Sequence, residues 1–250
     1  MSRFLTAFAP ALAPAFLLAA CSGASITPSA DAATNGGDTA SKVALGDTAR
    51  PTVIELYQSQ GCSSCPPADK VVNRVADRPD VIALSFAVTY WDDLGWKDTF
   101  ASPAFTARQW DYAHAAGRSV VATPQVIVNG KQPVLGSREG ELNDAIARNA
   151  NHDGPTVTAD AGKVTVSAGK GDATVWLVRY DPRTINVAVA GGENEGATIP
   201  HRNIVKQLTP LGQWHGSQAS FTLPAAPAGL KTAVLVQQGK GGPIIAAGRA

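Results

Sequence analysis

The sequence is poor in the residues that most metal sites use. Its 250 residues include only three cysteines, one methionine and four histidines. A zinc site built from four thiolates is excluded, because no second C-x-x-C accompanies Cys62 and Cys65. The single methionine argues against a copper carrier, since copper carriers often add thioether ligands to their thiolates. We therefore predict no resident metal and no cofactor.

Charge of one sign and long apolar runs are also scarce. Lys and Arg number 21 against 20 for Asp and Glu, and no basic run occurs, which excludes the electrostatic footprint of a nucleic-acid-binding protein. The apolar stretch within residues 1–20 is interrupted by Pro10 and Pro14 and is too short to span a bilayer permanently. Because Arg3 precedes it, this stretch predicts an export signal.

Cys21 directly follows the export signal. The residues Leu18-Ala19-Ala20-Cys21 resemble the lipobox of bacterial lipoproteins, in which the cysteine is acylated and becomes the mature N-terminus. Since Ser22 is not the aspartate that usually signals inner-membrane retention, the resemblance implies anchoring on the periplasmic side of the outer membrane. Ordinary cleavage, giving a soluble periplasmic protein, is the alternative. Residues 21–50 are rich in small and polar residues and are predicted to form a flexible linker.

The other two cysteines lie between a predicted strand and a predicted helix. Residues 52–57 are rich in β-branched residues and predict a buried strand. Pro66 and Pro67 fit only the first turn of a helix, and apolar residues follow at helical spacing. Cys62 and Cys65 are therefore expected at a helix N-terminus, where free N–H groups and the helix dipole favour a thiolate.

A C-x-x-C pair in this position can be oxidised and reduced without unfolding the protein. We predict a redox-active Cys62–Cys65 disulfide whose sulfurs are exposed at the mouth of the helix. The alternatives are half of a zinc site, a static structural disulfide, or a Cu(I) site, because soft thiolates select that ion.

The residues around the pair predict an α/β domain over residues 51–153. An apolar run at residues 81–88 predicts a central strand, and Asn129-Gly130 between two apolar runs predicts a hairpin. Ser102 is expected to cap a helix in an insert, and Ser137 to cap a closing helix. The order βαβ, helical insert, ββα is that of a thioredoxin-like domain with a mixed sheet and flanking helices.

Two motifs carry a family resemblance. CSSC after a strand and Thr123-Pro124 before a later strand resemble the C-x-x-C and the cis-proline loop of the thioredoxin superfamily. The phrases SQGCSSCPPAD, YWDDLGWKD, FASPAFTARQ and TPQVIVNG are similar to a bacterial family of exported thioredoxin-like proteins known only as a domain of unknown function. The resemblance implies that Pro124 is cis and faces the cysteines, beside backbone groups that pair with an extended substrate chain. A trans proline that starts a strand is the alternative.

Three further residues are candidates for the site. Glu55, in the strand before the pair, is either a buried acid that shuttles protons to Cys65 or a solvent-facing residue. Trp91 and Trp96 belong to an aromatic insert, and they either bind substrate together with Thr123 or fill the gap between helix and sheet.

Residues 154–250 differ in character from the rest. Short, often alternating apolar runs separated by glycine-rich turns predict an all-β antiparallel sandwich-like domain. It carries no catalytic motif, and it is expected to dock a partner or to cover an edge of the first domain. His201 and His215 are expected to lie at the surface or to have hydrogen-bond partners.

Together these features predict a periplasmic thiol–disulfide oxidoreductase. Cys62 attacks a substrate disulfide and Cys65 resolves the mixed disulfide. The expected partners are protein thiols or disulfides in the cell envelope and, through the lipid on Cys21, the membrane. Two other functions stay open: a Cu(I)-handling protein that uses the same thiolates, and a binding module whose disulfide is inert.

Overall fold

The computed structural model describes residues 47–250. The predicted export signal over residues 1–20, the predicted lipidation site Cys21 and almost all of the linker over residues 21–50 lie outside the described residues. Within the described part, no helix is long and apolar enough to cross a membrane.

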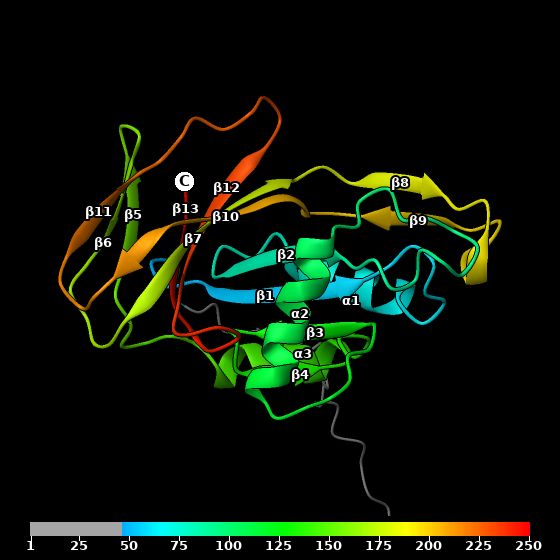
Figure 1. The fold of residues 1–250 in the computed structure, drawn as a ribbon, viewed down its shortest axis with the longest axis horizontal. Coiled ribbons are helices and arrows are strands. Elements are labelled where there is room, and N and C mark those ends of the chain that lie inside the picture. Colours follow the sequence, from blue (N-terminus) through cyan, green and yellow to red (C-terminus); the bar gives the residue numbers. More distant parts are fainter. Residues whose placement is uncertain (1–46) are drawn as a thin grey trace, which may run out of the picture. The chain divides into compact units, whose positions relative to one another are not determined.

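Eight strands form one mixed sheet in the order β13-β12-β7-β10-β2-β1-β3-β4 (Figure 1). The first half of the chain contributes β1 (Thr52–Gln58), β2 (Val81–Ala87), β3 (Gln125–Val128) and β4 (Gln132–Val134). β1 and β2 are parallel and buried along their whole length, as the apolar runs predicted. β3 and β4 form the predicted hairpin, whose turn residues Asn129 and Gly130 both have left-handed backbone angles.

Three helices accompany these strands. They are α1 (Pro66–Val75), α2 (Pro103–Ala115) and α3 (Glu139–Arg148). α2 begins as predicted, with the Ser102 hydroxyl accepting a hydrogen bond from the Ala104 N–H. The predicted cap at Ser137 is wrong, because α3 begins after Arg138 and has no side-chain cap. Acidic residues in its first turn complement the helix dipole instead.

The alternation of side chains along β1 separates two apolar layers. Ile54 and Leu56 point to one face, where they pack with α1 and α3. Val53 and Tyr57 point to the other face, where they pack with α2. Glu55 shares this second face and is the one charged residue of β1. α2 therefore covers one side of the sheet, and the helix that follows the cysteines covers the opposite side.

The second half of the chain extends the same sheet. Its strands β7 (Ala173–Asp181), β10 (Ile204–Trp214), β12 (Lys231–Gln237) and β13 (Ile244–Arg249) join at β10, where Ile204 pairs with Ser85 of β2. The Asn203 side chain strengthens this junction by donating to the Ala83 carbonyl. A thioredoxin-like domain followed by a separate sandwich is therefore not confirmed, because the free edge of β2 pairs with the C-terminal strands. The boundary predicted between residues 153 and 154 stays a prediction.

Two smaller sheets complete the second half. β5 (Val157–Asp160), β6 (Lys163–Val166) and β11 (Ala219–Thr222) pack on β7, β12 and β13 around the fully buried Trp214. β8 (Ile185–Ala188) and β9 (Thr198–His201) form a hairpin of their own. β9 and β13 were not predicted, because the proline in β9 and the small residues in β13 weaken their strand pattern.

Candidate functional site: a buried disulfide under a hairpin tip

Cys62 and Cys65 form a disulfide where β1 ends and α1 begins. Their Cα atoms are 5.4 Å apart, within the usual range for a disulfide. Cys65 is the N-cap residue of α1. The order of strand, C-x-x-C and helix thus agrees with the sequence-based prediction.

The first turn of α1 is less favourable to a thiolate than an ordinary helix start. Pro66 and Pro67 carry no N–H group. The N–H groups of Ala68 and Asp69 both bond to the Cys65 carbonyl. The amides that usually stabilise an anion at a helix N-terminus are therefore missing or already engaged.

Both sulfur-bearing residues are buried. Cys62 is 0% exposed and Cys65 is 1% exposed, whereas Ser63 and Ser64 between them are exposed. The expectation of exposed sulfurs is therefore wrong for the disulfide form. A segment from the distant second half of the chain bonds to the loop that carries the cysteines, which we define as the cysteine loop (residues 59–65).

This segment is the tip of the β8–β9 hairpin, which we define as residues 191–194. It includes the short helical turn η1 (Gly192–Asn194) and lies beyond the free ends of β8 and β9 (Figure 1). The Glu193 carboxylate accepts hydrogen bonds from the Ser63 N–H, at 3.0 Å, and from the Ser63 hydroxyl, at 2.7 Å. The Asn194 side chain donates to the carbonyl oxygens of Gln60, at 2.8 Å, and Cys62, at 2.9 Å. The bonds from Ser63 lower the pKa of Glu193 below its ordinary value.

Sequence reasoning missed Glu193 and Asn194. They follow Gly191 and Gly192, which indicated only a turn, and they are separated from Ser63 and Cys62 by 130 residues or more. A single sequence offers no pattern that would place this turn on the cysteine loop.

Gln60 anchors the loop from the other side. Its N–H donates to the buried carboxylate of Asp98, at 2.8 Å, and its side-chain oxygen accepts a hydrogen bond from the Trp96 indole, at 2.9 Å. Burial raises the pKa of Asp98, although two backbone N–H groups oppose this effect. Together with the Asn194 bond to its carbonyl, these contacts hold Gln60 at three points.

The proline loop, Thr123 and Pro124, lies beside the cysteine loop. The Thr123–Pro124 peptide bond is cis. The Ser64 hydroxyl lies 3.5 Å from the Thr123 carbonyl oxygen and 3.3 Å from the Cys62 Sγ. The Ser64 side chain therefore connects the cysteine loop with the proline loop. Beside Pro124 is an open cleft of about 300 Å³, whose lining includes the half-exposed side chain of Leu135.

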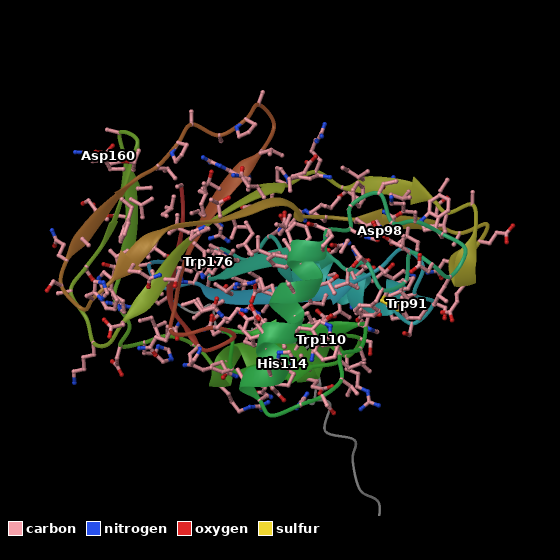
Figure 2. The ribbon with its side chains drawn as sticks, viewed as in Figure 1. Trp91, Asp98, Trp110, His114, Asp160 and Trp176 are labelled. Carbon is pink, nitrogen blue, oxygen red and sulfur yellow. A yellow bond between two sulfur atoms is a disulfide. The ribbon has the colours of Figure 1, made fainter. Side chains whose placement is uncertain are left out.

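The predicted tryptophans lie near this loop, and their indole groups bond to protein atoms. The Trp91 indole donates to the Thr123 hydroxyl, at 2.7 Å, and Trp91 also packs against the core under α2. Trp96 lies against the hairpin tip. The two are so close that a Cβ atom on Gly192 would lie only 3.2 Å from the Trp96 Cβ. Trp110 instead pairs with His114 on α2, with ring centroids 5.3 Å apart (Figure 2). The substrate-binding roles of Trp91, Trp96 and Thr123 stay predictions.

Glu55 is buried but is not brought to Cys65. It is 0% exposed, so the solvent-facing alternative is wrong. One carboxylate oxygen accepts a hydrogen bond from Arg108, at 2.7 Å, and the other accepts one from the Tyr112 hydroxyl. Glu55 therefore lies between the sheet and α2, whereas α1, which follows Cys65, packs on the opposite face.

Asp69 is the buried acid on the cysteine side of the sheet. It lies one helical turn after Cys65 and is 2% exposed. Its Oδ1 is 3.7 Å from Nδ1 of His201, which is fully buried, and neither ring nitrogen of His201 has a hydrogen-bond partner within residues 47–250. The expectation for His201 is therefore wrong, while His215 is exposed beside Asp172 as expected.

Burial raises the pKa of Asp69, and the neighbouring His201 only partly opposes this effect. Protonation of such an acid therefore stabilises the folded state. This stabilisation is complete below the pKa of the unfolded state, and it is lost as the pH rises through the higher pKa of the folded state. Asp69→Asn should therefore be more stable than the wild type at neutral pH, by on the order of 1 kcal/mol. The difference should shrink in acid.

Urea unfolding at a series of pH values measures this difference. Asp144→Asn, on the exposed side of α3, is the matched control and should change little. The groups that face Asp69 include His201, which in turn lies near Asp98. If Asp69→Asn were destabilising at neutral pH, Asp69 and His201 would form an ionised pair instead.

The described residues show no candidate metal centre. No group of three or more His, Cys, Asp or Glu side chains within residues 47–250 is arranged to hold a metal ion.

Comparisons with known proteins agree on a shared fold. A protein of Agrobacterium tumefaciens, AGR_C_4864, has a crystal structure that matches with a TM-score of 0.70 and 32% sequence identity, covering 82% of this chain and 95% of that one. HBP35 of Porphyromonas gingivalis matches with a TM-score of 0.53 and 11% identity, covering 82% of this chain and 76% of that one. No curated protein matches the sequence. The family model described as "Protein of unknown function (DUF1223)" matches residues 53–237, and the chain therefore belongs to the DUF1223 family.

Proposed function

We propose that this protein is a thiol–disulfide oxidoreductase that exchanges disulfides with other proteins through Cys62 and Cys65. The observation that carries the proposal is the Cys62–Cys65 disulfide between β1 and α1, with the Thr123–Pro124 loop beside it. A pair joined across one helical turn can open and close while the surrounding fold stays in place.

The exchange requires two steps. In the reducing direction, the Cys62 thiolate attacks one sulfur of a substrate disulfide, a mixed disulfide forms, and the released substrate sulfur takes up a proton. The Cys65 thiolate then attacks the Cys62 sulfur, which releases the second substrate sulfur as a thiol. Two electrons pass to the substrate, and a dithiol of another protein must reduce the Cys62–Cys65 disulfide again. The same steps in reverse oxidise a substrate dithiol.

The proline loop supports a role in holding the substrate chain. Thr123 and Pro124 precede β3, and the cleft beside Pro124 is open to solvent. An extended peptide that lies along such a loop can form main-chain hydrogen bonds while its sulfur approaches the cysteines. Trp91, which donates to Thr123, would position this loop.

A binding module with an inert disulfide is the second candidate, and the burial of both cysteines favours it. The two candidates differ in reduction potential, because structural disulfides resist reduction by the glutathione pool, whereas exchanging pairs are more readily reduced. Cu(I) handling by the same thiolates is tested separately, by titrating the reduced protein with Cu(I) in competition with a chelator.

Trapping of the mixed disulfide tests the proposed function. In the full-length chain carrying Cys21→Ser, we expect Cys65→Ala to form a stable adduct between Cys62 and a peptide that contains one disulfide, because the resolving thiol is gone. Mass spectrometry of the intact protein measures the adduct. Cys62→Ala is the matched control, and Cys65 should then form little adduct. If neither variant forms an adduct after full reduction of the protein, the exchange mechanism is wrong.

We also propose that the protein is exported and anchored through a lipid on Cys21, on the periplasmic side of the outer membrane. The support is the apolar segment within residues 1–20 and the Leu18–Cys21 pattern. Such a compartment permits disulfides to persist. The mass of the mature N-terminal peptide tests this proposal, since an unmodified Cys21, or a chain that retains Met1, would contradict the anchor.

A further inference from the structure

The hairpin tip forms hydrogen bonds with the loop on which the proposed disulfide exchange would take place. Cys62 is 0% exposed, yet a substrate sulfur must touch its Sγ for exchange. Within the tip, Glu193 bonds to Ser63, the residue after Cys62, and Asn194 bonds to the Cys62 carbonyl. If the proposed function holds, the loop must rearrange to expose this sulfur, and the tip is a distant segment that bonds to the backbone of both residues.

The tip can move while the base of the hairpin stays in place. The base is fixed because α1 packs on β9, where Ile199 and His201 are buried and Asn73 donates to the Pro200 carbonyl. The tip, in contrast, contains Gly192 and is followed by Gly196, and both glycines have φ values in the left-handed region, at 71° and 81°. Rotation at glycines allows the segment between them to lift at little steric cost.

The tip also alters the electrostatics at Cys62. Its Glu193 carboxylate occupies the Ser63 N–H, which is an amide that could otherwise stabilise a Cys62 thiolate. A negative charge bonded to Ser63, the residue after Cys62, also disfavours a second negative charge at Cys62. Pro66 and Pro67 have no N–H group to offer. While the tip is closed, Cys62 therefore has few neighbouring groups that could stabilise its thiolate.

We propose that Glu193 and Asn194 are positioning residues that form a displaceable cover over Cys62. In this proposal, which rests on the proposed thiol–disulfide function, Asn194 holds the tip on the cysteine loop and Glu193 keeps the Cys62 thiolate disfavoured while the tip is closed. A substrate chain gains access when it displaces the tip and takes over the hydrogen bonds of Ser63 and of the Gln60 and Cys62 carbonyls.

Alkylation of Cys62 separates the two roles. The full-length chain carrying Cys21→Ser is reduced with a dithiol, and the rate of Cys62 modification by iodoacetamide is followed by peptide mapping from about pH 5 to about pH 9. The midpoint of the rate–pH curve reports the pKa of the Cys62 thiol, and its plateau at high pH reports access to the sulfur.

The neutral variant Asn194→Ala should raise the plateau about tenfold and leave the midpoint almost unchanged, because a net loss of about 1.4 kcal/mol of hydrogen bonding corresponds to that factor. Glu193→Gln should lower the midpoint, since it removes the negative charge that is bonded to Ser63, next to Cys62 in the chain. Glu195→Gln removes a charge two residues further along the same turn and should change neither value.

A second variant protects the test against misfolding of the first. A Cβ atom at Gly191 would lie 2.5 Å from the Gly95 carbonyl oxygen, so Gly191→Ala must separate the tip from the loop around Gly95. It should raise the plateau as Asn194→Ala does. If both variants fold and neither raises the plateau, the cover is excluded.

The cover and the proposed function can fail independently. Alkylation requires no substrate disulfide, so a higher plateau in Asn194→Ala supports the cover by itself. If the protein does not turn over a disulfide peptide in the same preparation, the oxidoreductase function fails and the cover stands. Conversely, wild-type turnover together with an unchanged plateau in Asn194→Ala and Gly191→Ala overturns the cover and leaves the function intact.

Discussion

Replacing Cys62 by serine is expected to reduce the turnover of a disulfide-containing peptide on the order of a thousandfold or more, the scale seen when a catalytic nucleophile is removed. A serine hydroxyl cannot form the mixed disulfide through which both electrons pass.

The measurement is the release of peptide thiols by the full-length reduced protein, followed over time with a thiol-reactive dye. Cys21→Ser is the matched control and should retain the wild-type rate, because it removes a cysteine outside the C-x-x-C. Full turnover in Cys62→Ser would show that Cys62 takes no part in the exchange, and would contradict the proposed function.

Replacing Arg108 by methionine should lower the free energy of unfolding by about 3 to 5 kcal/mol, the usual loss when one partner of a buried ion pair is removed. Arg108 is 6% exposed and bonds to Glu55, to the Gln237 side chain and to the Tyr112 hydroxyl. Burial lowers the pKa of Arg108, but the nearby Glu55 carboxylate and the tyrosine hydroxyls outweigh this effect and raise it above its ordinary value. Without Arg108, the Glu55 carboxylate would be buried without a countercharge.

A double-mutant cycle in urea unfolding measures this coupling. Glu55→Leu combined with Arg108→Met should lose less stability than the sum of the two single changes, because the double variant buries no unpaired charge. Arg118→Met, at an exposed position after α2, is the control and should stay within about 0.5 kcal/mol of the wild type. A strictly additive cycle would mean that Glu55 and Arg108 do not stabilise each other.

The Glu55–Arg108 pair also shows why its role could not be assigned from the sequence. The position of Glu55 in a buried strand is evident from the apolar residues around it, but whether it faces the cysteines depends on which face α2 covers. Arg108 reaches it from α2, and Gln237 reaches Arg108 from β12. The acid that shares a face with Cys65 is instead Asp69, whose neighbour His201 comes from β9.

Local chemistry was sufficient for the elements of the first half of the chain. Asn129-Gly130 predicted the hairpin because few other dipeptides adopt two left-handed backbone conformations in succession. Ser102 and Pro103 predicted the start of α2, and the two prolines after Cys65 predicted the start of α1. These signals depend on neighbouring residues, so a sequence contains them in full.

The sequence alone determined that a C-x-x-C pair stands between a strand and a helix, because spacing, apolar runs and prolines act over a few residues. Only the tertiary structure decided that the C-terminal strands continue the same sheet and that Glu193 and Asn194 lie on the cysteine loop. Pairing between strand edges and contacts across 130 residues depend on how the whole chain packs, since backbone groups at an edge bond to any strand of suitable register.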